Sequence, residues 1–225
     1  VMIAAPKTVK SEEEKKTGNY FAEMKEGLRF ITNDKLILAI VIMIMLTNFL
    51  DSVFSGVVRP VYVKAVYDNA VSLGLLIAAN GGGAVIGGLI FASIGHRLPR
   101  HTVFVAAFVL TGLQFWVYAL QPPIYILAAS VLITSMGAGP LNPIIGAVEF
   151  ERIPPDMRGR VFGAVTAGAW MAMPFGMLLG GVLTEKFSYL PMLIALGITY
   201  FFTTLSMAFI PAMKEMNRKV QASTE

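Results

Sequence analysis

Apolar residues dominate the chain from position 36 onward and gather into six nearly uninterrupted segments. Each segment is close to the roughly 20 residues that an α-helix needs to cross about 30 Å of hydrocarbon. The six segments are Leu36–Val58, Leu73–Ile94, Thr102–Leu120, Ile124–Ala147, Val161–Leu183 and Leu190–Ile210. This pattern predicts an all-α integral membrane protein with six transmembrane helices in one bundle, over residues 35–213.

The connections between these segments are short and rich in turn-forming residues. They read Tyr67-Asp68-Asn69, Arg97-Leu98-Pro99-Arg100, Gln121-Pro122-Pro123, Pro154-Pro155-Asp156 and Phe187-Ser188-Tyr189. Because short loops leave no room for a long crossover, consecutive helices are predicted to be antiparallel neighbours.

The two ends of the chain are polar. Residues 1–18 have no periodicity and are typical of a flexible cytoplasmic linker, and residues 214–225 are assigned to a cytoplasmic C-terminal tail. Between linker and bundle, residues 19–34 carry apolar side chains at helical spacing, namely Phe21, Met24, Leu28 and Ile31. They predict an amphipathic helix in the membrane interface, or alternatively an ordinary solvated helix.

Composition narrows the class of protein further. Of the 225 residues, 56% are hydrophobic and only 14% are charged, against about 25% charged in a typical soluble domain. No cysteine is present, which excludes disulfides and thiolate chemistry. The chain begins at Val1, without a signal peptide, so we expect it to be a piece of a longer polypeptide.

Lysine and arginine are unevenly shared between the two sides of the predicted membrane. One side carries the Lys-rich N-terminal segment and a set of basic residues in the hairpins and tail, namely Arg97, Arg100, Arg152, Arg158, Arg160, Lys214, Arg218 and Lys219. The other side has only Arg59, Lys64 and Lys186. The asymmetry predicts a multi-pass protein of the cell (inner or plasma) membrane with both termini in the cytoplasm. It also explains the net charge of +4 without nucleic-acid binding.

The first apolar segment contains a polar stripe, made of Asn48, Asp51, Ser52, Ser55 and Arg59 at helical spacings. A carboxylate inside a bilayer costs a few kcal/mol, so Asp51 should face a water-filled path or a charged partner. One hypothesis assigns the stripe to substrate-cation binding or proton coupling. The alternative is that Asp51 lies near the outer mouth and pairs with Arg59 or a neighbouring helix.

The second and fourth segments contain residues that favour close packing and kinks. The second is rich in glycine between Asn80 and Gly88, which allows a neighbouring helix to approach closely, and Asn80 is assigned to the same pathway. The fourth contains Pro140 and Pro143, which remove backbone donors and predict a kink at Asn142. Asn142 then lines a cavity, or the kink only shapes packing.

The fifth segment combines small residues with soft, polarizable ones. Gly176 and Gly180 form a small-xxx-small pair for helix packing. Trp170 and Met173 suit varied apolar ligands and are assigned to the substrate pathway, the alternative being core or lipid-facing packing.

The residues show no catalytic apparatus. There is no phosphate-binding loop followed by Lys and Ser/Thr, no His pair at metal spacing and no nucleophile elbow, and His96 and His101 flank a basic turn. We therefore expect no enzymatic activity, no cofactor and no metal site.

Three stretches carry a family resemblance: Gly95-His-Arg-Leu-Pro-Arg100, Glu151-Arg-Ile-Pro-Pro-Asp-Met-Arg-Gly-Arg-Val-Phe-Gly163 and Glu26-Gly-Leu-Arg-Phe-Ile31. Over residues 19–213 the chain resembles the C-terminal half of the major facilitator superfamily, in its drug- and macrolide-efflux branch. The resemblance marks a cytoplasmic loop motif at Gly95, Arg97, Arg100, Arg158, Gly159 and Arg160. The family's acidic position in the first loop is held here by Ser93 or Gly95, which puts a charge-relay role for Arg97 in doubt.

The resemblance implies that the six helices are the seventh to twelfth of a twelve-helix secondary transporter. Its function would be proton-driven efflux of amphipathic small molecules by alternating access, with the first, second, fourth and fifth spans facing the path. Its partners would be the substrate, the lipid bilayer and the missing N-terminal six-helix half. Alternatives are a homodimeric six-helix transporter, with a second copy as partner, and a non-transport membrane assembly protein.

Overall fold

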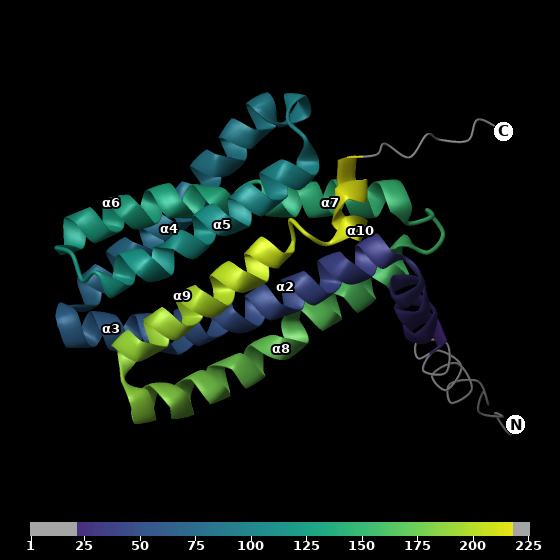
Figure 1. The fold of residues 1–225 in the computed structure, drawn as a ribbon. Helices are drawn as coiled ribbons and strands as arrows, with labels where there is room; N and C mark the ends of the chain where they lie inside the picture. The colour runs from purple at the N-terminus through teal and green to yellow at the C-terminus, as the bar shows by residue number, and fades with distance from the viewer. Residues whose placement is uncertain (1–21, 218–225) are drawn as a thin grey trace, which may run out of the picture.

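The computed structural model describes residues 22–217, which are helical apart from short turns. A first helix over residues 22–33 precedes the labelled elements of Figure 1. Those elements are α2 (Lys35–Val53), the π-helical η1 (Phe54–Val58), α3 (Arg59–Val66), α4 (Ala70–Ile94), the 3₁₀ turn η2 (Gly95–Arg97), α5 (Arg100–Ala119), α6 (Ile124–Ser135), the 3₁₀ turn η3 (Met136–Ala138), α7 (Leu141–Arg152), α8 (Arg158–Phe187), α9 (Tyr189–Ser206), α10 (Pro211–Lys214) and the 3₁₀ turn η4 (Glu215–Asn217).

Six helical units in this part of the chain are long and apolar enough to cross a membrane, which confirms the predicted number of spans. The first unit joins α2, η1 and α3, and the fourth joins α6, η3 and α7. The units lie side by side as one bundle, with α2 packed on α8, α4 on α6 and α5 on α9 (Figure 1). Consecutive units run in opposite directions, as the short loops predict (Figure 1). The main packing contacts, however, join units that are not consecutive, so the prediction that all consecutive helices are neighbours is wrong.

The first span is longer than predicted and runs to Val66 instead of Val58. Asp34 caps its start, with one carboxylate oxygen accepting from the backbone N–H groups of Leu36 and Ile37. Beyond Val58 the helix continues because Tyr62 and Val63 are buried. The Tyr62 ring packs edge-on against the rings of Tyr118 and Tyr189, at centroid distances of 5.1 and 5.6 Å.

The last span is shorter than predicted, because its helix ends at Ser206. After a turn at residues 207–209 the chain enters α10 and η4, where the side chain of Met216 is only 1% exposed. Arg152 joins this segment to the start of α2, since its guanidinium donates to Glu215 at 2.5 Å and to Asp34 at 2.9 Å. These contacts connect α10 and η4, which run to Asn217, to the start of the first span.

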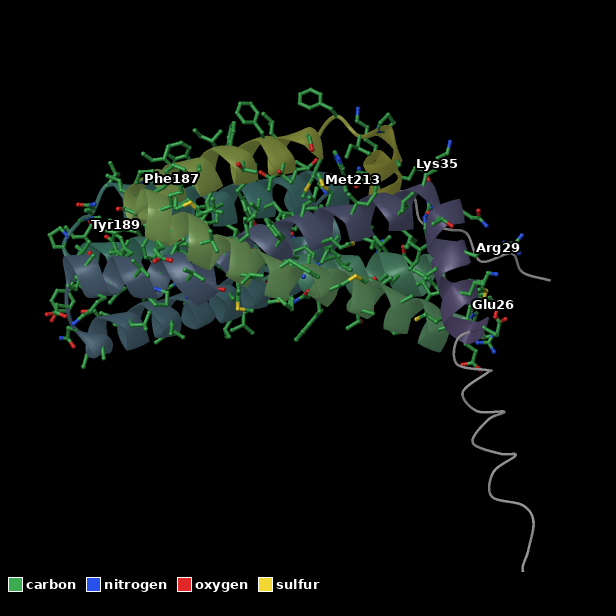
Figure 2. All side chains as sticks on the ribbon, turned by 90° about the horizontal axis from the view of Figure 1, so that it is seen from below. Glu26, Arg29, Lys35, Phe187, Tyr189 and Met213 are labelled. Atoms are coloured by element: carbon green, nitrogen blue, oxygen red, sulfur yellow. The ribbon has the colours of Figure 1, made fainter. Side chains whose placement is uncertain are left out.

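The helix over residues 22–33 runs across one end of the bundle (Figure 2). Arg160 of α8 donates to Glu26 of this helix at 2.6 Å. A Cβ atom on Gly27 would lie 2.7 Å from the Arg160 carbonyl oxygen, so glycine is needed at this close approach. The predicted linker at residues 1–18 lies outside the described part of the chain, as do Phe21 and the end of the predicted tail.

Glycines bring the helices into direct backbone contact, as the small-residue pattern predicts. A Cβ on Gly87 of α4 would lie 1.9 Å from the carbonyl oxygen of Met136, and one on Gly83 would lie 2.2 Å from that of Leu132. On α8, a Cβ on Gly176 would lie 2.7 Å from the carbonyl oxygen of Phe49. These contacts pack α4 on the fourth span and α8 on the first.

The two ends of the bundle differ in the chain segments that they carry. Lys35, Glu26 and Met213 lie at one end, and Phe187 and Tyr189 lie at the other (Figure 2). The described chain thus begins and ends on the same side of the bundle, the side that also holds the arginine hairpins.

Candidate functional site

A cavity of about 680 Å³ opens between α2, α7 and α8. Its wall consists mainly of apolar and aromatic side chains with a few polar ones, namely Ile44, Asn48, Asn142, Ile145, Glu149, Phe150, Phe162, Val165, Thr166, Ala169, Trp170 and Met173. A concave, mostly apolar site with a small number of polar groups is typical of small-molecule binding. Four of the residues predicted for the pathway lie in this wall: Asn48, Asn142, Trp170 and Met173.

The fourth span is broken where it reaches the cavity. After α6 the backbone passes through the 3₁₀ turn η3 and a turn at Gly139 and Pro140 before α7 begins at Leu141. The prolines remove backbone donors from this stretch, as predicted. The break itself lies at residues 136–140, before the predicted position, and Asn142 is inside α7. Asn142 lies exposed at the start of α7, and Ile145 and Glu149 follow on the same face at spacings of three and four residues.

The α2 wall is held to α8 by two side-chain hydrogen bonds. The Asn48 amide donates to the carbonyl oxygen of Ala169 at 2.9 Å, and the Ser52 hydroxyl donates to that of Met173 at 3.1 Å. Asn48 remains half-buried and lines the cavity, whereas Ser52 is buried in the helix contact. Ser52 therefore positions α8 and does not line the cavity.

The α8 wall supplies the largest side chains of the site. The Trp170 side chain is 66% exposed and Met173 is half-buried, and both line the cavity. Towards the arginine-rich end the rings of Phe150 and Phe162 meet edge-on at 5.1 Å. The Arg158 guanidinium stacks on the Phe150 ring at 5.1 Å, and it donates to the Phe150 carbonyl oxygen at 2.9 Å.

Eight of the twelve lining residues were not predicted, and Glu149 is the charged one among them. It is half-buried and lines the cavity from α7. Within residues 22–217 its carboxylate makes no hydrogen bond and no ion pair. A signal in the sequence could have identified Glu149: it follows Asn142 by seven residues, which is two helical turns along the same face.

The rest of the predicted stripe lies away from the cavity. Asp51 interacts electrostatically with Arg59 and with Tyr200 of α9, but no ion pair joins Asp51 to Arg59 in the described chain. Ser55, also of the stripe, is exposed and does not line the cavity. Asn80, the pathway residue predicted on α4, does not line it either, and its amide donates to the hydroxyl of Ser135 at 2.7 Å, which links α4 to α6.

The stripe is divided because the helix changes its winding at Phe54. Residues 54–58 form a π-helix, in which the Arg59 N–H donates to the Phe54 carbonyl oxygen five residues before it. This turn rotates Arg59 away from the position that α-helical spacing predicts. Arg59 is 9% exposed and stacks on the Phe54 ring at 4.8 Å, and its buried Nε has no hydrogen-bond partner among residues 22–217.

Rings around Arg59 form what we call the aromatic interior, at the contact of the first span with α5 and α9. Phe54 meets Phe115 and Tyr118 at 5.0 Å each, and Phe115 meets Tyr200 at 5.1 Å. All four rings are almost completely buried. The aromatic interior consists of Phe54, Phe115, Tyr118 and Tyr200.

The residues of the predicted loop motif make several different contacts. Arg100 forms a two-pronged ion pair with Glu151, at 2.6 and 2.8 Å, which joins the two arginine hairpins. Arg97 is exposed and donates to the His96 ring at 3.1 Å. Gly95 is buried against the Phe91 ring. A Cβ on Gly159 would meet no other part of the protein within 4 Å, so this glycine lies beside open space at the start of α8.

The described residues offer no alternative chemistry at this site. Within residues 22–217, no group of three or more His, Asp or Glu side chains is arranged to hold a metal ion. The cavity instead presents amides, one carboxylate and aromatic rings, which suit reversible binding of a small molecule.

Comparison with known proteins agrees with this geometry. The Major Facilitator Superfamily profile matches residues 8–225. The chain is 30% identical over 200 residues to the multidrug efflux pump Tap of Mycobacterium tuberculosis, covering 89% of this chain and 48% of Tap. It is 21% identical over 170 residues to macrolide efflux protein A of Streptococcus pyogenes, covering 75% of this chain and 42% of that protein.

The chain spans about half the length of the curated relatives that it matches. No solved structure matches it at a significant level. The superfamily comprises membrane transporters rather than enzymes, and its profile covers the described bundle from end to end. The chain therefore belongs to the Major Facilitator Superfamily.

Proposed function

We propose that this chain forms one six-helix half of an efflux transporter that moves amphipathic small molecules across the cell membrane by alternating access. The observation that carries the proposal is the cavity between α2, α7 and α8, whose wall is apolar and aromatic with a few polar groups. Its volume of about 680 Å³ falls within the range of roughly 300–1,000 Å³ typical of small-molecule sites. The relatives named as multidrug and macrolide efflux pumps support this interpretation.

The broken fourth span supports a transport role for the cavity. Discontinuous helices at the wall of a central site are a recurring feature of secondary transporters, because unwound backbone is tolerated only where it lines a cavity or is buried in protein. In this chain the break at residues 136–140 lies directly before Asn142.

The partner that completes the path is another six-helix bundle. Gly81 and Gly82 of α4 and Gly163 and Gly181 of α8 have open space around them. Helix faces lined with small residues allow close helix packing in a membrane. We propose that the N-terminal half of the same transporter covers these faces, with a second copy of this chain as the alternative partner. Both termini of this chain then lie in the cytoplasm.

Replacing Trp170 by alanine tests the role of the cavity. Trp170→Ala should lower efflux of a fluorescent amphipathic substrate from cells at least about fivefold, because it removes the largest ring of the wall. The control is Trp116→Ala, because Trp116 is the second tryptophan of the chain and lies on α5, outside this cavity. At equal membrane expression, this variant should keep efflux within about twofold of the wild type. Equal efflux by both variants would contradict the proposal.

We further propose that a proton gradient drives export and that Asp51 carries the proton. Asp51→Asn should then abolish uphill transport into proteoliposomes with an imposed pH gradient while binding is retained, because an amide cannot release a proton but preserves size. Uphill transport at the unchanged rate would show that Asp51 is instead a structural charge near Arg59.

A further inference from the structure

Glu149 differs from the charged residues beside it in having no partner. Glu151 is bound by Arg100, and Arg152 is bound by Asp34 and Glu215. The Glu149 carboxylate, in contrast, makes no ion pair or hydrogen bond within residues 22–217 and lies half-buried in the cavity wall. A carboxylate in such a place favours an occupant that brings a positive charge.

The described cavity wall carries a negative charge and no positive one. Among the residues that line it in the described structure, Glu149 is the sole ionisable side chain, so no lysine, arginine or histidine offsets its charge there. Arg158, at the start of α8, is engaged with the Phe150 ring and with the carbonyl oxygens of Phe150 and Ile153. Arg158 keeps its charge outside the wall, and Glu149 is the charge that the wall itself presents to an occupant, which favours a cation over an anion there.

Aromatic rings surround the place where a bound cation would lie. Phe150, Phe162 and Trp170 line the same cavity as Glu149, and Trp170 remains largely exposed. Aromatic faces attract organic cations, and indole does so most strongly. The stacking of Arg158 on Phe150 shows that a cation is accommodated against a ring of this wall.

We propose that Glu149 makes the cavity selective for amphipathic organic cations, such as protonated amines and quaternary ammonium or phosphonium ions. Glu149 supplies the charge, the rings of Trp170, Phe150 and Phe162 bind the apolar body, and Asn48 and Asn142 add polar contacts from the same wall. This inference rests on the proposed function, because it assigns the substrate class of the same cavity.

The test uses two ions of matched size and shape that differ in the sign of their charge. Binding of tetraphenylphosphonium and of tetraphenylborate to the complete transporter, purified in a neutral maltoside detergent, is measured with ion-selective electrodes. The wild type should bind the phosphonium ion at least tenfold more tightly. Glu149→Gln should reduce this preference at least tenfold, and Glu149→Asp, which keeps the charge, should retain most of it.

Controls separate this inference from the proposed function. Glu151→Gln, two residues away and outside the cavity wall, should keep the wild-type preference, and Glu149→Met is a second neutral variant if the glutamine variant does not fold. If a folded neutral variant of Glu149 keeps the wild-type preference for the phosphonium ion, the proposed role of Glu149 is wrong. Weaker binding of both ions to Trp170→Ala would still support the cavity as the binding site. If Trp170→Ala binds both ions as the wild type does, the cavity is not the binding site and both proposals fail.

Discussion

One acidic residue of a membrane-spanning helix lies in the wall of the cavity, and another interacts with a ring of the aromatic interior, yet their surroundings differ. In the cavity, Glu149 shares an open wall with Trp170 and has no partner among the described residues. In the aromatic interior, the rings meet at 5.0 to 5.1 Å, and Asp51 interacts electrostatically with the buried guanidinium of Arg59. One region is hollow and accessible, and the other is filled.

The difference shows that residue type and depth do not determine the role of a membrane carboxylate. Asp51 on α2 and Glu149 on α7 each have polar or aromatic neighbours on their own helix, but different helices pack against them. Asp51 faces the side of the first span that meets α9, as its interaction with Tyr200 indicates, whereas Glu149 faces the gap between α7 and α8. The packing partner decides whether a carboxylate is available to a ligand.

The largest expected effect comes from adding the same side chain to each region. A Cβ on Gly112 of α5 would lie 2.7 Å from the buried Tyr200 ring, so Gly112→Leu should lower the free energy of unfolding by about 3 kcal/mol through overpacking. Thr166→Leu adds bulk to the open cavity and should change it by less than about 0.5 kcal/mol. Thermal unfolding in maltoside detergent measures both, and equal losses would show that the two regions are packed alike.

The next effect concerns the charge of Arg59. Arg59→Gln removes the positive charge that interacts with the Asp51 carboxylate and should destabilise the protein by about 2 kcal/mol. Adding Asp51→Asn should restore about half of that loss, because the two residues act on each other. The measurement is a double-mutant cycle of melting temperatures. Strictly additive losses would mean that Asp51 and Arg59 contribute independently.

The fold could be predicted from the sequence because the bilayer forces long apolar segments to be helical. The ends of the helices could not, since they depend on tertiary packing. Burial of Tyr62 and Val63 carries the first span to Val66, and the buried Met216 holds a segment after α9 that has no apolar periodicity of its own.

Part of the site could also be predicted, because polar and bulky residues are conspicuous within apolar segments. Asn48, Asn142, Trp170 and Met173 are unusual residues in apolar segments, and the structure places them together in one wall. Glu149 was missed because the predicted fourth span ended at Ala147, two residues short of it, whereas the helix runs to Arg152. The π-helical winding at Phe54, which separates Arg59 from the rest of the stripe, leaves no local mark in the sequence.

The smallest effect tests whether the aromatic interior is dry. The Tyr118 hydroxyl is buried and has no hydrogen-bond partner in the described chain, while its ring packs at 5.0 Å from Phe54. Tyr118→Phe keeps the ring contact and removes an unsatisfied polar group, so it should raise the free energy of unfolding by up to about 1 kcal/mol. The same thermal unfolding experiment checks this, with Tyr125→Phe on the exposed part of α6 as the control that should show no change. A loss of stability in Tyr118→Phe would mean that water reaches the hydroxyl and Arg59, and the aromatic interior would then be a second hydrated site rather than a packed contact.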